Sequence, residues 1–109
     1  MSISILYVTH ENQENAHYFV QKLLKDRWIA CGNIFPINSI YHWRGEVEQS
    51  DEVVTLLKTR PELLPALLNK IESLHPYEVP CVLHWEVEAN PSYMKWIKEE
   101  TRELPDTQL

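Results

Sequence analysis

Glycine is scarce in this sequence of 109 residues, which contains only Gly32 and Gly45. The phosphate-binding loop of P-loop proteins and the dinucleotide-binding fingerprint of Rossmann folds both need several glycines at fixed spacing. Neither motif can be written anywhere in this chain. The sequence therefore excludes the usual nucleotide-cradling loops.

Long apolar runs, basic clusters and cysteines are scarce as well. The longest apolar run, Ile3 to Val8, is far shorter than the roughly 18 residues that suggest a membrane span, and no signal-peptide pattern surrounds it. A net charge of −6 and a pI of 5.3 give no electrostatic reason to bind nucleic acid or anionic lipid. We expect a cytoplasmic protein that begins near Met1, with Cys31 and Cys81 as free thiols.

The composition predicts one globular domain that covers residues 1–109. Hydrophobic residues make up 44% of the chain and charged residues 24%, as in ordinary folded proteins. A chain of this length buries enough surface for one core without disulfides or a metal. We expect the tail to fray after about residue 104.

The first half of the chain alternates between strand and helix patterns. The β-forming run Ile3 to Thr9 predicts a strand, and an apolar stripe that starts at Ala16 predicts the helix after it. Ala30 to Trp43 and Val47 to Thr59 have extended character and flank Gly45. These two segments predict a long hairpin.

The second half predicts another helix, another strand and a short terminal helix. Thr59 to Glu62 has the pattern of a capping box, Pro65 fits the first turn of a helix, and His75-Pro76 ends it. Cys81 to Val87 predicts the last strand, and Asn90-Pro91 begins the terminal helix. The order predicts an α+β fold, a ferredoxin-like βαββαβ sandwich with a long hairpin and a short C-terminal helix.

Alternation along the last strand predicts how it faces the core. The apolar side chains of Leu83, Trp85 and Val87 share one face, which we assign to the core. The other face carries one imidazole and two carboxylates, which could face a divalent cation but are more typical of a solvated surface, at His84, Glu86 and Glu88.

The predicted hairpin is too long for a compact monomer. A strand of about 14 residues spans roughly 45 Å, whereas a domain of this size has a diameter of about 34 Å. The overhanging end carries Tyr41, Trp43 and Val47, an edge that would cause aggregation unless another subunit covers it. We expect a closed oligomer, with a ring favoured because strand addition runs head to tail.

The densest cluster of chemistry-bearing residues runs from His75 to Pro80. Two prolines fix the backbone around an imidazole, a phenol and a carboxylate, which could bind a ligand or a metal. His75 also lies on the apolar face of the second predicted helix, so it could instead cap that helix and pack. Both interpretations stay open, because no second ligand stands at metal spacing from His75.

Tyr41, Trp43 and Lys58 are candidates for the wall of a ligand site. Positions 41 and 43 share a strand face, and an aromatic pair beside a cation suits an anionic or planar ligand. The other interpretation is packing between subunits, because aromatic residues are enriched in interface cores. No nucleophile elbow or metalloprotease helix motif occurs, so nothing in the sequence favours an enzyme.

Several motifs together resemble those of the divalent-cation tolerance family, CutA. The resemblance extends from about residue 3 to residue 101 and implies a ferredoxin-like subunit. It also implies a homotrimer whose hairpins pair between subunits, similar in architecture to the PII signalling proteins. The motifs that carry it are Ala30-Cys31-Gly32-Asn33, Pro36, Ser39 to Glu48, Glu52, Lys58-Thr59 and His75 to Pro80.

The resemblance implies a protein that acts by binding rather than by catalysis. The family is linked to tolerance of copper and other divalent cations. Its likeness to PII proteins suggests, as an alternative, a small anionic ligand sensed in the cleft between subunits, and a trimer that docks other proteins is a third reading. By position, His75 matches the histidine proposed as a metal ligand, and Tyr41, Trp43, Lys58 and Tyr77 match residues of the cleft. If the cleft holds a small ligand, we expect His75 to belong to it as well and to hydrogen-bond that ligand together with Tyr77.

This chain departs from the family pattern at positions that matter for a metal site. Some members carry a second histidine directly before the motif histidine and a cysteine near the end of the first strand, where this chain has Leu74 and Val8. Cys81 stands where a glutamate is common, and Gly32 replaces an apolar residue. The metal ligands that we expect, for copper or another divalent cation, are His75 and Cys81.

Overall fold

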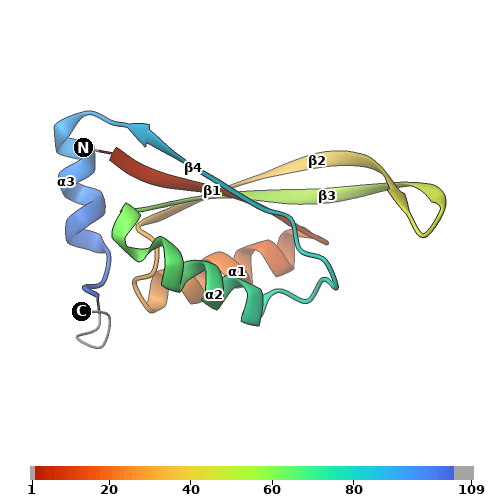
Figure 1. Ribbon diagram of the computed structural model, residues 1–109, viewed down its shortest axis with the longest axis horizontal. Coiled ribbons are helices and arrows are strands. Elements are labelled where there is room, and N and C mark those ends of the chain that lie inside the picture. The colour runs from red at the N-terminus through yellow and green to blue at the C-terminus, as the bar shows by residue number, and fades with distance from the viewer. Residues whose placement is uncertain (1, 105–109) are drawn as a thin grey trace.

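Four strands and three α-helices make up the part of the chain that the computed structural model describes, residues 2–104 (Figure 1). Their order confirms the predicted α+β fold. The predicted fraying after residue 104 lies outside the described residues. The elements are β1 (Ser2–His10), α1 (Gln13–Lys25), β2 (Cys31–Trp43), β3 (Glu46–Thr59), a 3₁₀ turn (Pro61–Leu63), α2 (Leu64–Leu74), β4 (Val82–Glu88) and α3 (Pro91–Glu100).

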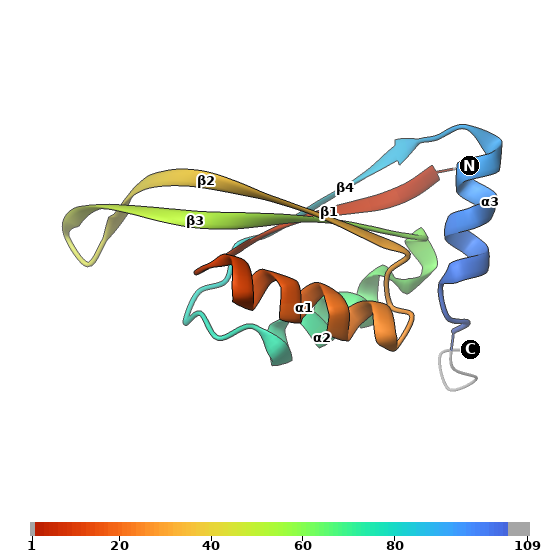
Figure 2. The same ribbon diagram turned by 180° about the vertical axis from the view of Figure 1, so that it is seen from behind.

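The strands form one antiparallel sheet in the order β2-β3-β1-β4. Helices α1 and α2 lie side by side on one face of this sheet, and α3 stands at the end where β1 begins (Figures 1 and 2). There the buried side chain of Ile97 in α3 packs with Ile3 and Ala30. The arrangement is a two-layer sandwich with an extra helix at one end.

The main core lies between the sheet and the two helices. Apolar side chains one turn apart on α1 and α2 meet alternate residues of the central strands, as the helical stripes predict. The buried members of this cluster are Leu6, Val8, Phe19, Val20, Leu23, Ile29, Leu57, Leu67 and Ile71.

Gly32 lets α1 approach β2 closely. A Cβ atom at this position would lie 2.7 Å from Cγ1 of Val20, which is closer than two carbon atoms can pack. The absence of a side chain at Gly32 therefore lets the helix lie directly against the strand.

The hairpin of β2 and β3 extends beyond the rest of the molecule (Figure 1). Arg44 and Gly45 turn it with φ angles of 51° and 84°, the two positive values that a twisted two-residue hairpin turn requires. The molecule measures 45 × 31 × 22 Å, so its longest axis confirms the predicted overhang.

Strand β4 turns the side opposite to the predicted one toward α1 and α2. Val87 does pack against the smaller core beside α3, and His84, Glu86 and Glu88 are exposed, as predicted. His84 pairs with the fully buried Leu6, so His84 lies on the helix-covered face of the sheet. Leu83 and Trp85 lie on the other face, 55% and 44% exposed. For Leu83 and Trp85 the prediction was wrong, because alternation shows which residues share a face, whereas the position of α1 and α2 decides which face they cover.

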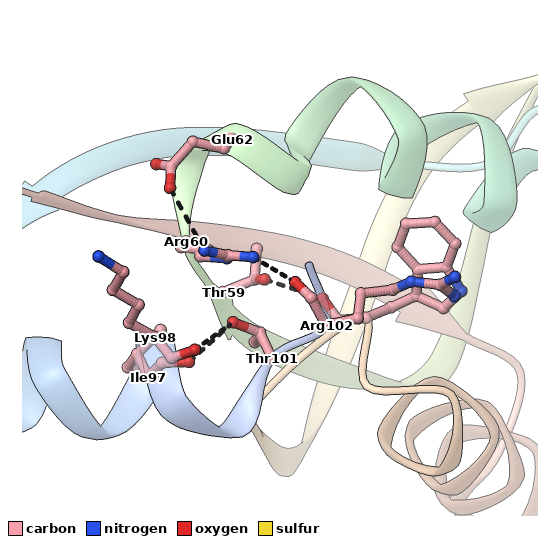
Figure 3. Close-up of polar contacts among 8 residues, drawn as sticks. Thr59, Arg60, Glu62, Ile97, Lys98, Thr101 and Arg102 are labelled. Atoms are coloured by element: carbon pink, nitrogen blue, oxygen red, sulfur yellow. Dashed lines mark hydrogen bonds and ion pairs between the residues drawn. The ribbon is translucent and has the colours of Figure 1, made fainter. Parts of the chain in front are cut away.

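The predicted capping box is also wrong. The Thr59 hydroxyl donates to the Trp28 carbonyl at 2.8 Å instead of capping a helix (Figure 3). Residue Arg60 is extended and a 3₁₀ turn precedes α2. Pro65 does lie in the first turn of α2, and the helix ends at His75, as predicted.

The end of α3 is fixed to the body of the protein by hydrogen bonds to main-chain carbonyls. The Arg60 guanidinium donates to the Arg102 carbonyl, and the Arg102 N–H donates to the Arg27 carbonyl at 2.8 Å. The Thr101 hydroxyl donates to the Ile97 carbonyl at 2.8 Å and closes the helix (Figure 3). These contacts hold α3 across one end of the sheet.

Candidate functional site

The sheet face that α1 and α2 leave uncovered is rich in apolar and aromatic side chains. We call this surface the open face. Its large side chains are between 37% and 55% exposed, which is unusual for residues of this type in a continuous surface. They come from β2 and β4, and strand register places all of them on one side: Phe35, Tyr41, Trp43, Leu83 and Trp85.

Tyr77 ties the loop before β4 to the hairpin. Its hydroxyl donates to Oε2 of Glu52 at 2.8 Å. Burial, followed by this hydrogen bond and the Glu52 charge, raises the pKa of Tyr77 above its ordinary value, so the phenol stays protonated. Arg44 at the hairpin turn reaches the same loop through an ion pair of 2.9 Å with Glu78.

His75 is buried and both of its ring nitrogens are engaged. Nε2 donates to the Thr9 carbonyl at 2.7 Å, and Nδ1 accepts the Tyr77 backbone N–H at 3.2 Å. The ring also stacks on that of His10, with centroids 5.3 Å apart. His75 therefore joins the end of β1 to the following loop, and a metal ion could bind its ring only if one of these hydrogen bonds broke.

Cys81 and Cys31 are free thiols, as predicted. Burial, followed by the nearby negative charge of Glu52, raises the pKa of the Cys81 thiol. A metal would have to displace the thiol proton. Within residues 2–104 no group of three or more His, Cys, Asp or Glu side chains is arranged to hold a metal ion.

Lys58 shares the open face with Tyr41 and Trp43 but lies at its other end. Tyr41 pairs with Glu48, and Lys58 is ten residues further along β3. That separation is about 33 Å at 3.3 Å per residue. Instead, Lys58 Nζ lies 5.8 Å from the ring centroid of Tyr93 in α3. One subunit thus brings His75 and Tyr77 together and leaves Lys58 far from the hairpin tip.

Two residues of this region were not among the predicted site residues. Glu52 accepts the Tyr77 hydrogen bond, and His10 stacks on His75. Burial, followed by the charge of His75, lowers the pKa of His10 to about 4. Their roles follow from contacts made across the fold, which no local sequence pattern marks.

Comparison with known proteins identifies close relatives. A model of the family described as CutA1 divalent ion tolerance protein matches residues 4–100. The divalent-cation tolerance protein CutA of Pyrococcus horikoshii is 41% identical over 99 residues, which cover 90% of this chain and 97% of that protein. Protein CutA of Bos taurus is 38% identical over 108 residues, which cover 97% of this chain.

The relatives differ in length and in the cellular compartment that their names give. This chain spans 61% of the length of the Bos taurus protein. A rice relative is called chloroplastic, and an Archaeoglobus fulgidus structure is described as periplasmic. In the part of this chain that the structure describes, no helix has the length and apolar character needed to cross a membrane.

Solved structures agree with the sequence matches. A crystal structure of CutA1 from Pyrococcus horikoshii has a TM-score of 0.89 at 40% identity and covers 92% of this chain and 99% of that chain. Sequence and fold thus agree over nearly the whole length. This chain belongs to the CutA1 divalent ion tolerance family.

Proposed function

We propose that this protein acts in divalent-cation tolerance as a cytoplasmic homotrimer that binds a ligand rather than catalysing a reaction. The observation that carries this proposal is the separation of Lys58 from Tyr41 and Trp43 at opposite ends of one open face. In a ring of copies packed head to tail, the hairpin tip of one subunit meets the Lys58 end of its neighbour. The binding cleft is then completed only between subunits.

The unpaired edge of β2 and the apolar open face of the subunit support this assembly. β2 is an edge strand of 13 residues, and no described residue pairs with its outer edge. Long exposed edges and apolar faces of this kind are usually covered, because they otherwise lead to aggregation. A second copy of the chain covers both features at once, and three copies are what the family resemblance implies.

The cleft suits a small anionic ligand. Lys58 would neutralise its charge, and Tyr41 and Trp43 would pack against it. Tyr77 and His75 hold the loop beside the hairpin through their contacts with Glu52 and Thr9. Their role in this arrangement is to position the cleft.

Mixed trimers test the proposal directly. Trp43→Ala and Lys58→Ala should each abolish the thermal shift that an anionic metabolite panel produces with the unmodified protein. Refolding the two variants together should restore binding in about a quarter of the clefts, because only one arrangement of neighbours supplies both side chains. Failure of the mixture to recover any binding, with trimers formed, would contradict a shared cleft.

A divalent cation is the second candidate ligand, which the family description favours, and copper is the cation that the resemblance implies. The charge of Glu52 contributes to the raised pKa of the Cys81 thiol, and a thiolate and a carboxylate are both groups that bind divalent cations. His75 would join them only by giving up the Tyr77 N–H, which leaves further ligands to come from another subunit.

Calorimetric titration of Cu(II) and Zn(II) into the reduced protein tests this candidate. Binding at Cys81 predicts that Cys81→Ser removes a saturable sub-micromolar site, whereas the matched variant Cys31→Ser keeps it. His75→Ala shows whether the imidazole takes part. Weak binding that neither Cys81→Ser nor His75→Ala changes would leave the anionic ligand as the better candidate.

A further inference from the structure

A cavity of about 250 Å³ opens on the helix-covered side of the sheet, away from the open face. It lies between α1 and the end of α2, where the two helices run side by side (Figure 1). Its lining includes three buried side chains, His10, Phe19 and His75, and more exposed ones from the same face of α1, among them Asn15 and Lys22. The cavity is too small for a nucleotide and suits a ligand with one ring.

His10 lines this cavity, and one of its ring nitrogens has no hydrogen-bond partner among the described residues. The residue is only 3% exposed, and its Nε2 lies 2.9 Å from Oγ1 of Thr55. The Thr55 hydroxyl is fully buried and has no other partner within residues 2–104, so we assign its proton to the hydrogen bond with Nε2, which leaves no buried donor unpaired. The proton of the neutral imidazole is then on Nδ1, which makes no hydrogen bond to any described residue.

The rest of the lining favours an aromatic ligand. The Phe19 ring packs against both histidine rings, at centroid distances of 4.7 Å to His10 and 6.0 Å to His75. Lys22 lies 5.9 Å above the ring of Tyr18 and makes no ion pair within residues 2–104. Glu11 also lines the cavity, so the charges near it are mixed.

We propose that this cavity is a second binding site, for a small planar aromatic compound that carries a carbonyl or carboxylate oxygen. The oxygen accepts the hydrogen bond of His10 Nδ1, the ring packs on Phe19, and Lys22 favours a carboxylate over a neutral acyl group. The site lies on the other side of the sheet from the proposed cleft and needs no second copy. It can therefore fail or hold independently of the proposed function.

Titration of benzoate and benzamide into ¹⁵N-labelled protein tests the site by NMR. Both probes should bind saturably with a dissociation constant on the order of 1 mM, as expected for ligands of this size, and should shift the backbone amides of His10, Asn15 and Phe19. No saturable shift of these amides at about 10 mM of either probe would overturn the proposal, and so would shifts confined to the open face.

Surface variants of α1 make the test specific without disturbing the core. Asn15→Trp should fill the mouth of the cavity and abolish binding of both probes. Glu14 is an exposed neighbour that does not line the cavity, so Glu14→Trp should leave the binding of both probes intact. Lys22→Gln should weaken benzoate about two- to fivefold and leave benzamide unchanged. Lys25→Gln is the matched control. Unchanged binding to Asn15→Trp would overturn the assignment.

Discussion

The two faces of the sheet differ in what covers them. On one face, Leu6, Val8 and Leu57 are fully buried beneath α1 and α2. On the other, Leu83 and Trp85 remain about half exposed, although they lie on β4, the strand that pairs with the buried strand β1. One face is completed within the chain, and we propose that other copies of the chain cover the other. The comparison separates the residues that fold the subunit from those that we propose assemble it.

The largest expected effect comes from a substitution that disrupts the open face alone. Trp85→Asp should convert the assembly to monomers at micromolar concentration, because a buried unpaired carboxylate costs several kcal/mol. His84→Asp places the same charge on the opposite side of β4 and should leave the assembly intact. Sedimentation velocity distinguishes the two outcomes. An unchanged oligomer with Trp85→Asp would show that the open face is not the interface.

A truncation in the main core tests the packing of the helix-covered face. Leu57→Ala should lower the free energy of unfolding by about 2–5 kcal/mol, because the truncated side chain leaves an empty space in a close-packed core. Leu24→Ala, on the exposed side of α1, should cost less than about 1 kcal/mol. Denaturant unfolding at equal protein concentration measures both. Equal losses would mean that α1 and α2 do not form the main core.

The pH dependence of stability sharpens the description of the helix-covered face. Folding lowers the pKa of His10 from 6.5 to about 4, so the unfolded chain binds the proton more readily. His10 should therefore contribute its full stabilisation above pH 6.5 and lose it as the pH falls to about 4. The loss amounts to about 3 kcal/mol.

The variant His10→Gln should remove most of this dependence. Denaturant unfolding of both proteins at pH 7 and pH 4.5 gives the difference. An equal loss of stability in His10→Gln and in the unmodified protein would assign the pH dependence to other groups.

The smallest effect concerns the contact between α1 and β2. Gly32→Ala should destabilise the protein by about 1–3 kcal/mol, because its methyl group overlaps Val20. The double variant Gly32→Ala/Val20→Ala should recover part of that loss. Thermal unfolding measures the series. A neutral Gly32→Ala would show that the helix shifts outward at little cost.

Local patterns were sufficient to predict most of the fold. Helical stripes, β-forming runs and turn residues depend on neighbours in the chain, so the order of elements and the turn near Gly45 were predicted correctly. The failures involve contacts between distant segments. The Thr59 hydroxyl binds the Trp28 carbonyl, 31 residues away, and the core-facing side of β4 depends on where the helices lie.

The candidate site was predictable only in part. The alternation of side chains along a strand predicted that Tyr41 and Trp43 share one face, and the structure confirms it. The engagement of both His75 nitrogens was not predictable, because Nε2 binds the Thr9 carbonyl 66 residues away. Neither was the partnership of Tyr77 with Glu52, which depends on how the loop folds back on the hairpin. Sequence identifies the residue types, and tertiary contacts decide which atoms are free to bind a ligand.

Sedimentation equilibrium of the unmodified protein tests the central claim, that copies of the chain cover the open face. The account predicts a single species with about three times the 12.9 kDa mass of one chain, constant across micromolar concentrations. A stable species of 12.9 kDa over the same range would contradict it.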